Sequence, residues 1–178
     1  KEAIENVVSN HVFKNEILSN TVFIIAGDIV YDMAHNEPRP EISTGHIING
    51  SDLDIIVIVN SLDKKIIKEL DDSLYSYKFM LMKMPAYKEE IDYIIKDIKK
   101  VKKQLLFNSF EDMVASKILY EGIYLYGSTR LFKRTKELIY KNNISEKLYV
   151  LENKAVVLRD EAEKFLLKSD TIASEDNL

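Results

Sequence analysis

The stretch that decides the fold is Gly50-Ser51-Asp52-Leu53-Asp54-Ile55-Ile56-Val57-Ile58-Val59, which joins a turn, two acidic residues and an uninterrupted apolar run. Five consecutive β-branched residues predict a strand that is buried on both faces of a sheet. Because side chains alternate across a strand, we expect Asp52 and Asp54 to lie on the same face, with α-carbons roughly 7 Å apart. Two carboxylates at that separation repel each other unless a cation lies between them.

This acidic pair predicts a site for a metal and a phosphate. A divalent ion, or two ions about 4 Å apart, would relieve the repulsion. Gly50 and Ser51 supply a turn that lets a phosphate approach. The same pattern is also typical of a strand end at which both carboxylates are simply solvated, so the pair does not decide between these interpretations by itself.

Composition and charge limit the class of protein. A chain of 178 residues is long enough for one domain, or for one domain with a helical appendage. Its net charge of −4 gives no global basic field for nucleic acid, and no apolar run approaches the roughly 20 residues of a membrane span. Without cysteine or a visible signal peptide, we expect a cytoplasmic location and no membrane partner. Because the first residue is Lys1 rather than Met, we expect a trimmed chain or a piece of a longer protein.

The residues before the central strand predict a helix, a strand and a loop. Residues 1–19 show helical spacing of apolar residues, and residues 21–26 form a short apolar run that ends at Gly27-Asp28. Residues 32–50 contain two prolines and two glycines, which indicate a long loop or a loose hairpin.

After the central strand, we expect a helix capped by Asn60 or Ser61 and then a strand over residues 90–95. Asp92 interrupts the apolar residues of this second strand. The lysine-rich residues 96–103 that follow are typical of a solvated face or loop.

The C-terminal half predicts helices around one more strand. Ser109 should cap a helix whose inner face is formed by Phe110, Val114 and Ile118, and a short strand should follow over residues 123–127. The last helix, which we expect to start at Ser145, carries apolar residues at alternating spacings of three and four. This stripe predicts packing rather than chemistry, and its members are Leu148, Leu151, Ala155, Leu158, Ala162 and Phe165.

Asp92 extends the acidic pair to a triad if its strand neighbours the central one. A lone Asp among Ile and Tyr residues costs several kcal/mol to bury unless it is paired or binds a metal. Three carboxylates around two divalent ions form the arrangement that phosphoryl and nucleotidyl transfer require.

The order of these motifs resembles the polymerase-β-type nucleotidyltransferase superfamily. The similarity lies in Gly50-Ser51-Asp52-Leu53-Asp54, in Asp92 within Glu90-Ile91-Asp92-Tyr93, and in the string from Lys117 to Gly127, which looks like the helix-to-strand end of small bacterial members. These members include minimal and aminoglycoside-modifying types, and the family often occurs in toxin–antitoxin or phage-defence systems. The resemblance covers about residues 20–128.

The resemblance implies an α/β fold, with a short mixed sheet whose helices pack mostly on one side. It implies a nucleotidyltransferase-like catalytic domain over residues 1–128, on which a C-terminal helical segment, residues 129–178, packs. It also implies Mg²⁺- or Mn²⁺-dependent transfer of a nucleotide from an NTP to a hydroxyl group. The acceptor would be a nucleic acid such as RNA, a protein or a small molecule, and an oligomer is compatible with the sequence.

The site that the resemblance implies places Asp52, Asp54 and Asp92 as catalytic and metal-binding residues, with Gly27, Gly50 and Ser51 near the phosphates. One departure is Gly27-Asp28, where the family usually has Gly-Ser; Asp28 would put a negative charge beside a triphosphate. The alternative is therefore a degenerate nucleotidyltransferase fold that serves as a binding or assembly module without catalysis.

Overall fold

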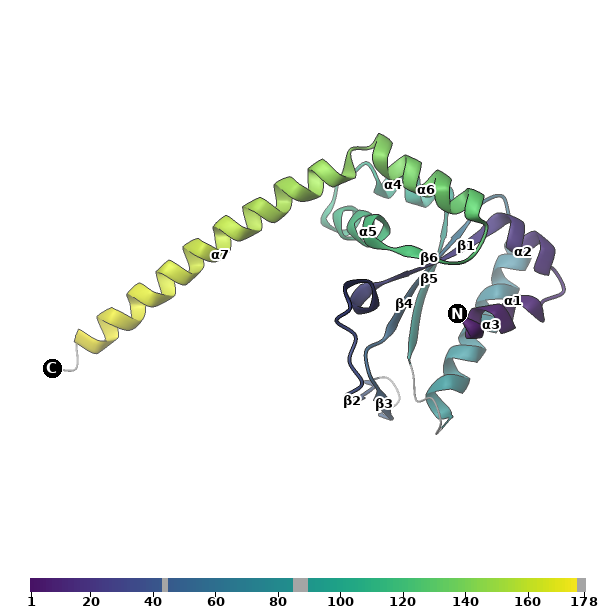
Figure 1. Cartoon of the computed structure of the whole chain (residues 1–178), viewed down its shortest axis with the longest axis horizontal. Helices are drawn as coiled ribbons and strands as arrows, with labels where there is room; N and C mark the ends of the chain where they lie inside the picture. Colours follow the sequence, from purple (N-terminus) through teal and green to yellow (C-terminus); the bar gives the residue numbers. More distant parts are fainter. Residues whose placement is uncertain (43–44, 85–89, 176–178) are drawn as a thin grey trace.

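A mixed four-stranded sheet forms the centre of the molecule (Figure 1). The computed structural model describes residues 1–42, 45–84 and 90–175, with side chains up to Leu167. The strands are β1 (Thr21–Ala26), β4 (Leu53–Val59), β5 (Ile91–Asp97) and β6 (Ile123–Gly127), in the order β5-β4-β1-β6. β4 and β5 are parallel, whereas β1 is antiparallel to both of its neighbours, so the sheet is mixed as expected.

The prediction for the apolar run is confirmed, since every residue from Ile55 to Val59 is buried. Ile55, Val57 and Val59 belong to the core on one face of the sheet, and Ile56 and Ile58 belong to the core on the other. Two buried faces require helices on both sides.

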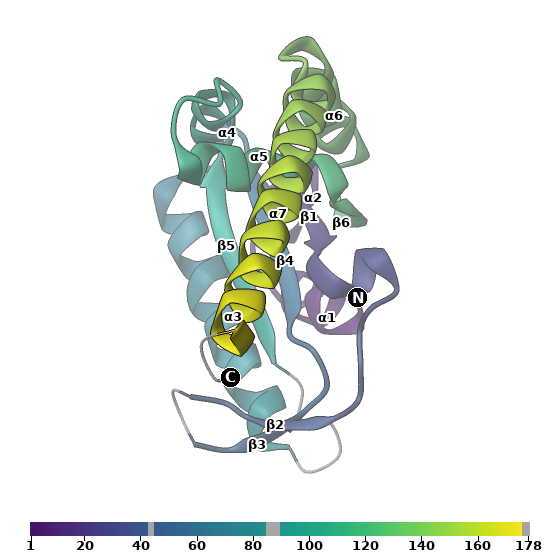
Figure 2. The same ribbon diagram turned by 90° about the vertical axis from the view of Figure 1, so that its left-hand side faces the viewer.

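The first face is covered by α1 (Glu2–Ser9), α2 (Lys14–Asn20) and α3 (Lys64–Lys83) (Figures 1 and 2). Residues 1–19 thus form most of two helices, separated by a turn in which Val12 is exposed. The N-cap of α3 is Asp63, whose carboxylate accepts from the Lys65 N–H at 2.7 Å, so the expected cap at Asn60 or Ser61 is wrong. Ser61 instead has a φ of 58° in the turn before the helix.

The second face is covered by α4 (Ile98–Gln104), α5 (Phe110–Glu121), α6 (Thr129–Lys141) and the start of α7 (Ile144–Glu175). The expectation that helices pack mostly on one side is therefore wrong, because the sheet offers apolar side chains on both. The lysine-rich segment is also not a loop: its apolar residues Ile98 and Val101 are buried and anchor α4 on the sheet.

α5 is capped by the Ser109 hydroxyl as predicted, but its inner face differs from the expected one. Ala115, Ser116 and Leu119 are buried. The expected inner residues are partly exposed, and these are Phe110, Val114 and Ile118.

A hairpin lies beyond the end of the sheet at which β1 ends and β4 begins (Figure 1). It follows a short 3-10 helix, η1 (Gly27–Tyr31), and consists of β2 (Pro38–Pro40) and β3 (Ile47–Asn49). The loose hairpin predicted for residues 32–50 is thus confirmed.

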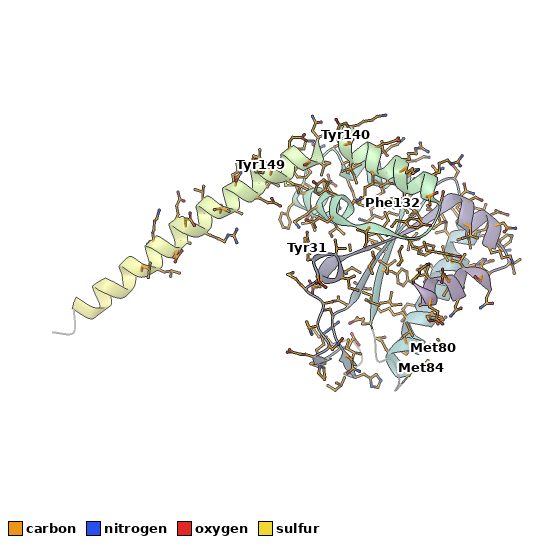
Figure 3. The ribbon with its side chains drawn as sticks, in the orientation of Figure 1. Tyr31, Met80, Met84, Phe132, Tyr140 and Tyr149 are labelled. Atoms are coloured by element: carbon orange, nitrogen blue, oxygen red, sulfur yellow. The ribbon has the colours of Figure 1, made fainter. Side chains whose placement is uncertain are left out.

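The end of α3 carries a cluster of methionines. Met82 is buried, whereas Met80 and Met84 are partly exposed near the end of the helix (Figure 3).

α7 leaves the rest of the molecule as a long projecting helix (Figures 1 and 2). Ile144 and Leu148 are buried in the second core, Leu151 is half-buried, and every residue of 152–167 is exposed. The expectation that the whole apolar stripe packs within the chain is therefore wrong beyond Leu151. The division of the chain at residue 128 stays a prediction. Within the described residues, no helix combines the length and apolar content that crossing a membrane requires.

Candidate acidic site at the end of the sheet

Four carboxylates gather where β1 ends and where β4 and β5 begin. In the parallel pairing of β4 and β5, Asp54 lies directly opposite Asp92, and on its other side Asp54 pairs with Ala26 of β1. Cα partners in adjacent strands present their side chains on the same face, so Asp54 and Asp92 share a face. This is the face of Ile56 and Ile58, two and four residues further along β4.

The sheet is open to solvent at this point. The Asp92 side chain is 61% exposed, and Ile94, the next residue of β5 on the same face, is 45% exposed. The helices of the second face cover residues further along the strands, such as Ile56 and Ile58 of β4, which are buried. The acidic end of the sheet is therefore accessible to a ligand.

Gly27 makes room for the Asp54 carboxylate. The backbone φ of Gly27 is +72°, and a Cβ at this position would lie 2.1 Å from the Asp54 Oδ2. No other residue type fits both the backbone conformation and this close approach. The sequence thus places a glycine where the acidic strand needs space, which is a different role from the phosphate contact predicted for Gly27.

Asp54 is the carboxylate whose pKa the other three carboxylates of the site influence. Burial raises the pKa of the Asp54 carboxyl above its usual value, and the neighbouring carboxylates Asp52, Asp92 and Asp28 raise it further. Among the described residues, no cation forms an ion pair with Asp54. An unpaired carboxylate beside three others favours the approach of a cation.

Asp52 and Asp92 are each held by a basic side chain. Arg39 of β2 lies 3.7 Å from Asp52, and Lys78 of α3 lies 3.1 Å from Asp92. Glu90 joins the two pairs, because its carboxylate lies 3.0 Å from Arg39 and 3.8 Å from Lys78. The pairs to the aspartates are partly exposed, and such pairs contribute only about 0–1 kcal/mol. Releasing Asp52 or Asp92 to another cation therefore costs little.

As these side chains lie, no group of three His, Cys, Asp or Glu residues in the described part of the chain encloses a metal position. Asp52 and Asp92 instead form ion pairs with Arg39 and Lys78 of the chain itself. The donor set nevertheless suits Mg²⁺ or Mn²⁺, which prefer carboxylate oxygens. Asp54 is the best-placed ligand, and Asp52 and Asp92 could join it by exchanging their partners.

Gly50 and Ser51 hold the hairpin in place. The Gly50 N–H donates to the Glu37 carbonyl and the Ser51 N–H donates to the His35 carbonyl, both at 3.1 Å. The Ser51 hydroxyl donates to the Asp28 carboxylate at 3.4 Å. Because these donors are occupied within the chain, phosphate contacts of Gly50 and Ser51 stay a prediction. Asp28 is exposed, but it contacts Ser51 and its charge acts on Asp54, which makes it the fourth carboxylate of the site.

Sequence reasoning did not find the basic residues around the acidic end. Besides Arg39 and Lys78, Lys117 of α5 donates to the hydroxyl of Tyr31 in η1 at 3.0 Å and forms an ion pair with Glu121. Lys117 belongs to the string that carries the family resemblance, so its motif was visible although its role was not. No local pattern marks Arg39 or Lys78, since their partners are distant in sequence.

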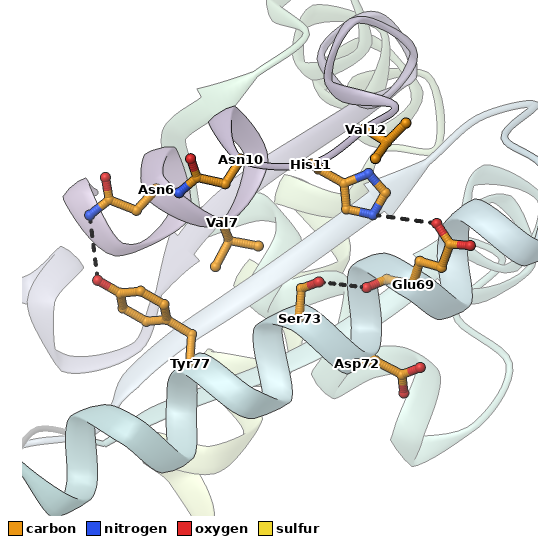
Figure 4. Close-up of a pocket in the computed structure, with 9 residues that line it drawn as sticks. All are labelled: Asn6, Val7, Asn10, His11, Val12, Glu69, Asp72, Ser73 and Tyr77. Atoms are coloured by element: carbon orange, nitrogen blue, oxygen red, sulfur yellow. Dashed lines mark hydrogen bonds and ion pairs between the residues drawn. The ribbon is translucent and has the colours of Figure 1, made fainter.

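A groove lies elsewhere, between α1 and α3 (Figure 4). In this groove His11 Nε2 lies 3.9 Å from the Glu69 carboxylate, and Asn6 contacts the Tyr77 hydroxyl. His11 Nδ1 accepts from the Phe13 N–H at 3.1 Å, which orients the ring within the chain. None of the residues predicted to be functional lines this groove.

Comparison with protein-family models, with curated proteins and with solved structures found no match to this chain.

Proposed function

We propose that this protein is a metal-dependent nucleotidyltransferase that moves a nucleotide from an NTP to a hydroxyl group of an acceptor. One observation carries the proposal: Asp54 lies unpaired among the described residues, directly opposite Asp92 and influenced by Asp52, Asp92 and Asp28, at a solvent-open end of the sheet. An ionised carboxylate that has no cation partner and lies beside other carboxylates costs stability, which is reasonable when a bound ligand supplies the positive charge.

The order of the motifs supports the same class of reaction. Asp52 and Asp54 at the start of β4, together with Asp92 in the parallel neighbour β5, follow the pattern of the polymerase-β-type superfamily. The mixed sheet is compatible with that superfamily's fold, which remains part of the proposal.

The roles of the residues follow from this resemblance and from the ion pairs. Bound Mg²⁺ or Mn²⁺ ions would polarise the triphosphate and lower the pKa of the acceptor hydroxyl. Asp52 and Asp54 would hold these ions, and Asp92 would serve as a ligand near the acceptor hydroxyl and as a possible base for its proton. When Asp52 and Asp92 turn toward the ions, Arg39 and Lys78 would still pair with Glu90. The two basic side chains would then offset the negative charge of Glu90 at the edge of the site.

A specific set of contacts favours the alternative, a nucleotidyltransferase-like fold that binds or assembles without catalysis. Asp92 is paired with Lys78, Asp28 stands where a serine is usual, and the N–H groups of Gly50 and Ser51 are occupied by the hairpin. These contacts would have to rearrange for catalysis, whereas a binding module could keep them.

The test is a transfer assay with each labelled NTP, Mg²⁺ or Mn²⁺, and total cellular RNA and protein as acceptors. We expect a labelled acceptor with the wild-type chain and none with Asp54→Asn. Asp92→Asn should bind the metal–NTP complex within about tenfold of the wild type, a difference of about 1.4 kcal/mol, while transfer falls by orders of magnitude. Metal-dependent NTP binding without any labelled product would support the binding module instead.

A further inference from the structure

The projecting part of α7 carries an apolar seam with the spacing of a coiled coil. Leu151, Ala155, Leu158, Ala162 and Phe165 follow one another at spacings of four, three, four and three residues. This period keeps the residues on one side of the helix. All of them except the half-buried Leu151 are exposed, and Leu158 is 64% exposed. Because burial of such a seam is favourable, the exposed length of α7 is suited to a second helix.

We propose that the occupant is a second copy of this chain, with the two α7 helices antiparallel. Four charged residues flank the seam: Glu152 and Arg159 on one side, Lys154 and Glu161 on the other. Among the side chains that the structure describes, none of these four takes part in an ion pair. Their charges are therefore available to a partner.

The charge pattern is self-complementary in one antiparallel register. When the two-fold axis passes between Val156 and Val157, Lys154 faces Glu161 of the second copy, and Glu152 faces its Arg159. Each pair occurs twice, because a two-fold interface repeats every contact. Opposite charges then meet along both sides of the seam.

The apolar residues fit the same register. Ala155 lies opposite Leu158 of the second copy, and Leu151 lies opposite its Ala162, so a small residue always faces a large one. This alternation lets the side chains of the two helices interdigitate while the distance between the helices stays even.

Other arrangements of the two helices bring like charges together. A parallel pair would place Lys154 beside Arg159 of the second copy and would stack Ala155 on Ala155. Sliding the antiparallel helices by one heptad, seven residues, in one direction places Lys154 opposite Lys154. Sliding them in the other direction places Glu161 opposite Glu161 and Arg159 opposite Arg159. The charges thus select one register and one orientation.

The test uses the full chain in sedimentation experiments over a wide range of protein concentration at low salt. We expect a reversible dimer for the wild type and about tenfold weaker dimerisation for Lys154→Glu, which puts a second carboxylate opposite Glu161 in both symmetry-related pairs. The double variant Lys154→Glu/Glu161→Lys restores the opposite charges and should dimerise within about threefold of the wild type. In a parallel dimer Lys154→Glu would instead strengthen association, because the new carboxylate would pair with Arg159.

Leu158→Asp tests the seam directly and should abolish the dimer, while circular dichroism shows an unchanged fold because Leu158 is exposed in the single chain. A wild-type chain that stays monomeric at every concentration overturns the proposal. So does a dimer that is unaffected by Leu158→Asp, or one that Lys154→Glu strengthens. Association through α7 is independent of nucleotide transfer, so loss of one leaves the other intact.

Discussion

The two ends of β4 differ in what they do for the molecule. From Ile55 to Val59 every side chain is buried and contributes to one of two cores, each covered by its own helices. At the other end, burial raises the pKa of Asp54, and the neighbouring carboxylates raise it further. The apolar end stabilises the fold, whereas ionisation of Asp54 at the acidic end opposes it.

The largest effect is expected from a charge placed at the apolar end. Val57→Asp would bury an unpaired carboxylate in the first core, where the wild-type side chain is 0% exposed. We expect a loss of more than about 4 kcal/mol, enough to unfold many domains. Chemical denaturation followed by circular dichroism measures it, and a folded variant with wild-type midpoint would show that β4 is not the centre of the fold.

A smaller loss of stability is expected at Gly27, where the end of β1 leaves space for the Asp54 carboxylate. Gly27→Ala should cost about 1–3 kcal/mol, because alanine is strained at a φ of +72° and its Cβ would overlap the Asp54 carboxylate. Gly45→Ala is the matched control, since Gly45 has a φ of +69° but nothing within 4 Å of the added Cβ. Equal losses for the two variants in chemical denaturation would mean that the approach of Asp54 to Gly27 is unimportant.

Removing the charge of Asp54 should stabilise the protein slightly. The folded-state pKa of Asp54 is raised, mainly by burial, so its ionisation opposes folding. This penalty is absent below the unfolded pKa of about 3.9 and grows as the pH rises through the folded pKa. Asp54→Asn should therefore be more stable than the wild type at pH 7 by up to about 1 kcal/mol, allowing for solvent screening, and equally stable near pH 3.5.

Denaturation curves at both pH values measure this difference. The control is Asp92→Asn, which should not stabilise, because the Asp92 charge is already paired with Lys78. A destabilised Asp54→Asn at pH 7 would mean that the protein itself satisfies the Asp54 charge.

The smallest effect is expected on α7. Leu158→Asp makes the same kind of change as Val57→Asp, but at an exposed position, and should alter the unfolding free energy of the single chain by less than about 0.5 kcal/mol. Denaturation at low protein concentration, where the chain is monomeric, checks this. A large loss would show that the outer part of α7 packs on its own chain.

Several parts of the fold could be predicted from the sequence because local physics dictates them. The apolar runs predicted β1 with its bounds and the buried part of β4, and Ser109 marked the start of α5. In α4 the signal was present but was hidden by lysines: Ile98, Val101 and Leu105 recur at helical spacing and are buried.

Other features depend on contacts between distant residues and could not be predicted. The ion pair between Arg39 and Glu90 joins residues 51 positions apart, and it exists only because the hairpin lies beside the start of β5. The stripe of α7 packs within the chain only as far as Leu151, and an apolar stripe alone does not say whether its partner lies within the chain. The approach of Gly27 to Asp54 likewise follows from the pairing of β1 with β4.

The assignment of the acidic end depends most directly on whether it binds a metal–nucleotide complex. Titration calorimetry with a non-hydrolysable NTP, with and without Mg²⁺, should be run on the wild type and on Asp54→Asn. We expect metal-dependent binding to the wild type and at least about a hundredfold weaker binding to Asp54→Asn, a difference of about 2.7 kcal/mol. Absence of metal-dependent binding to the wild type, or equal affinity in the variant, would contradict the assignment of this site.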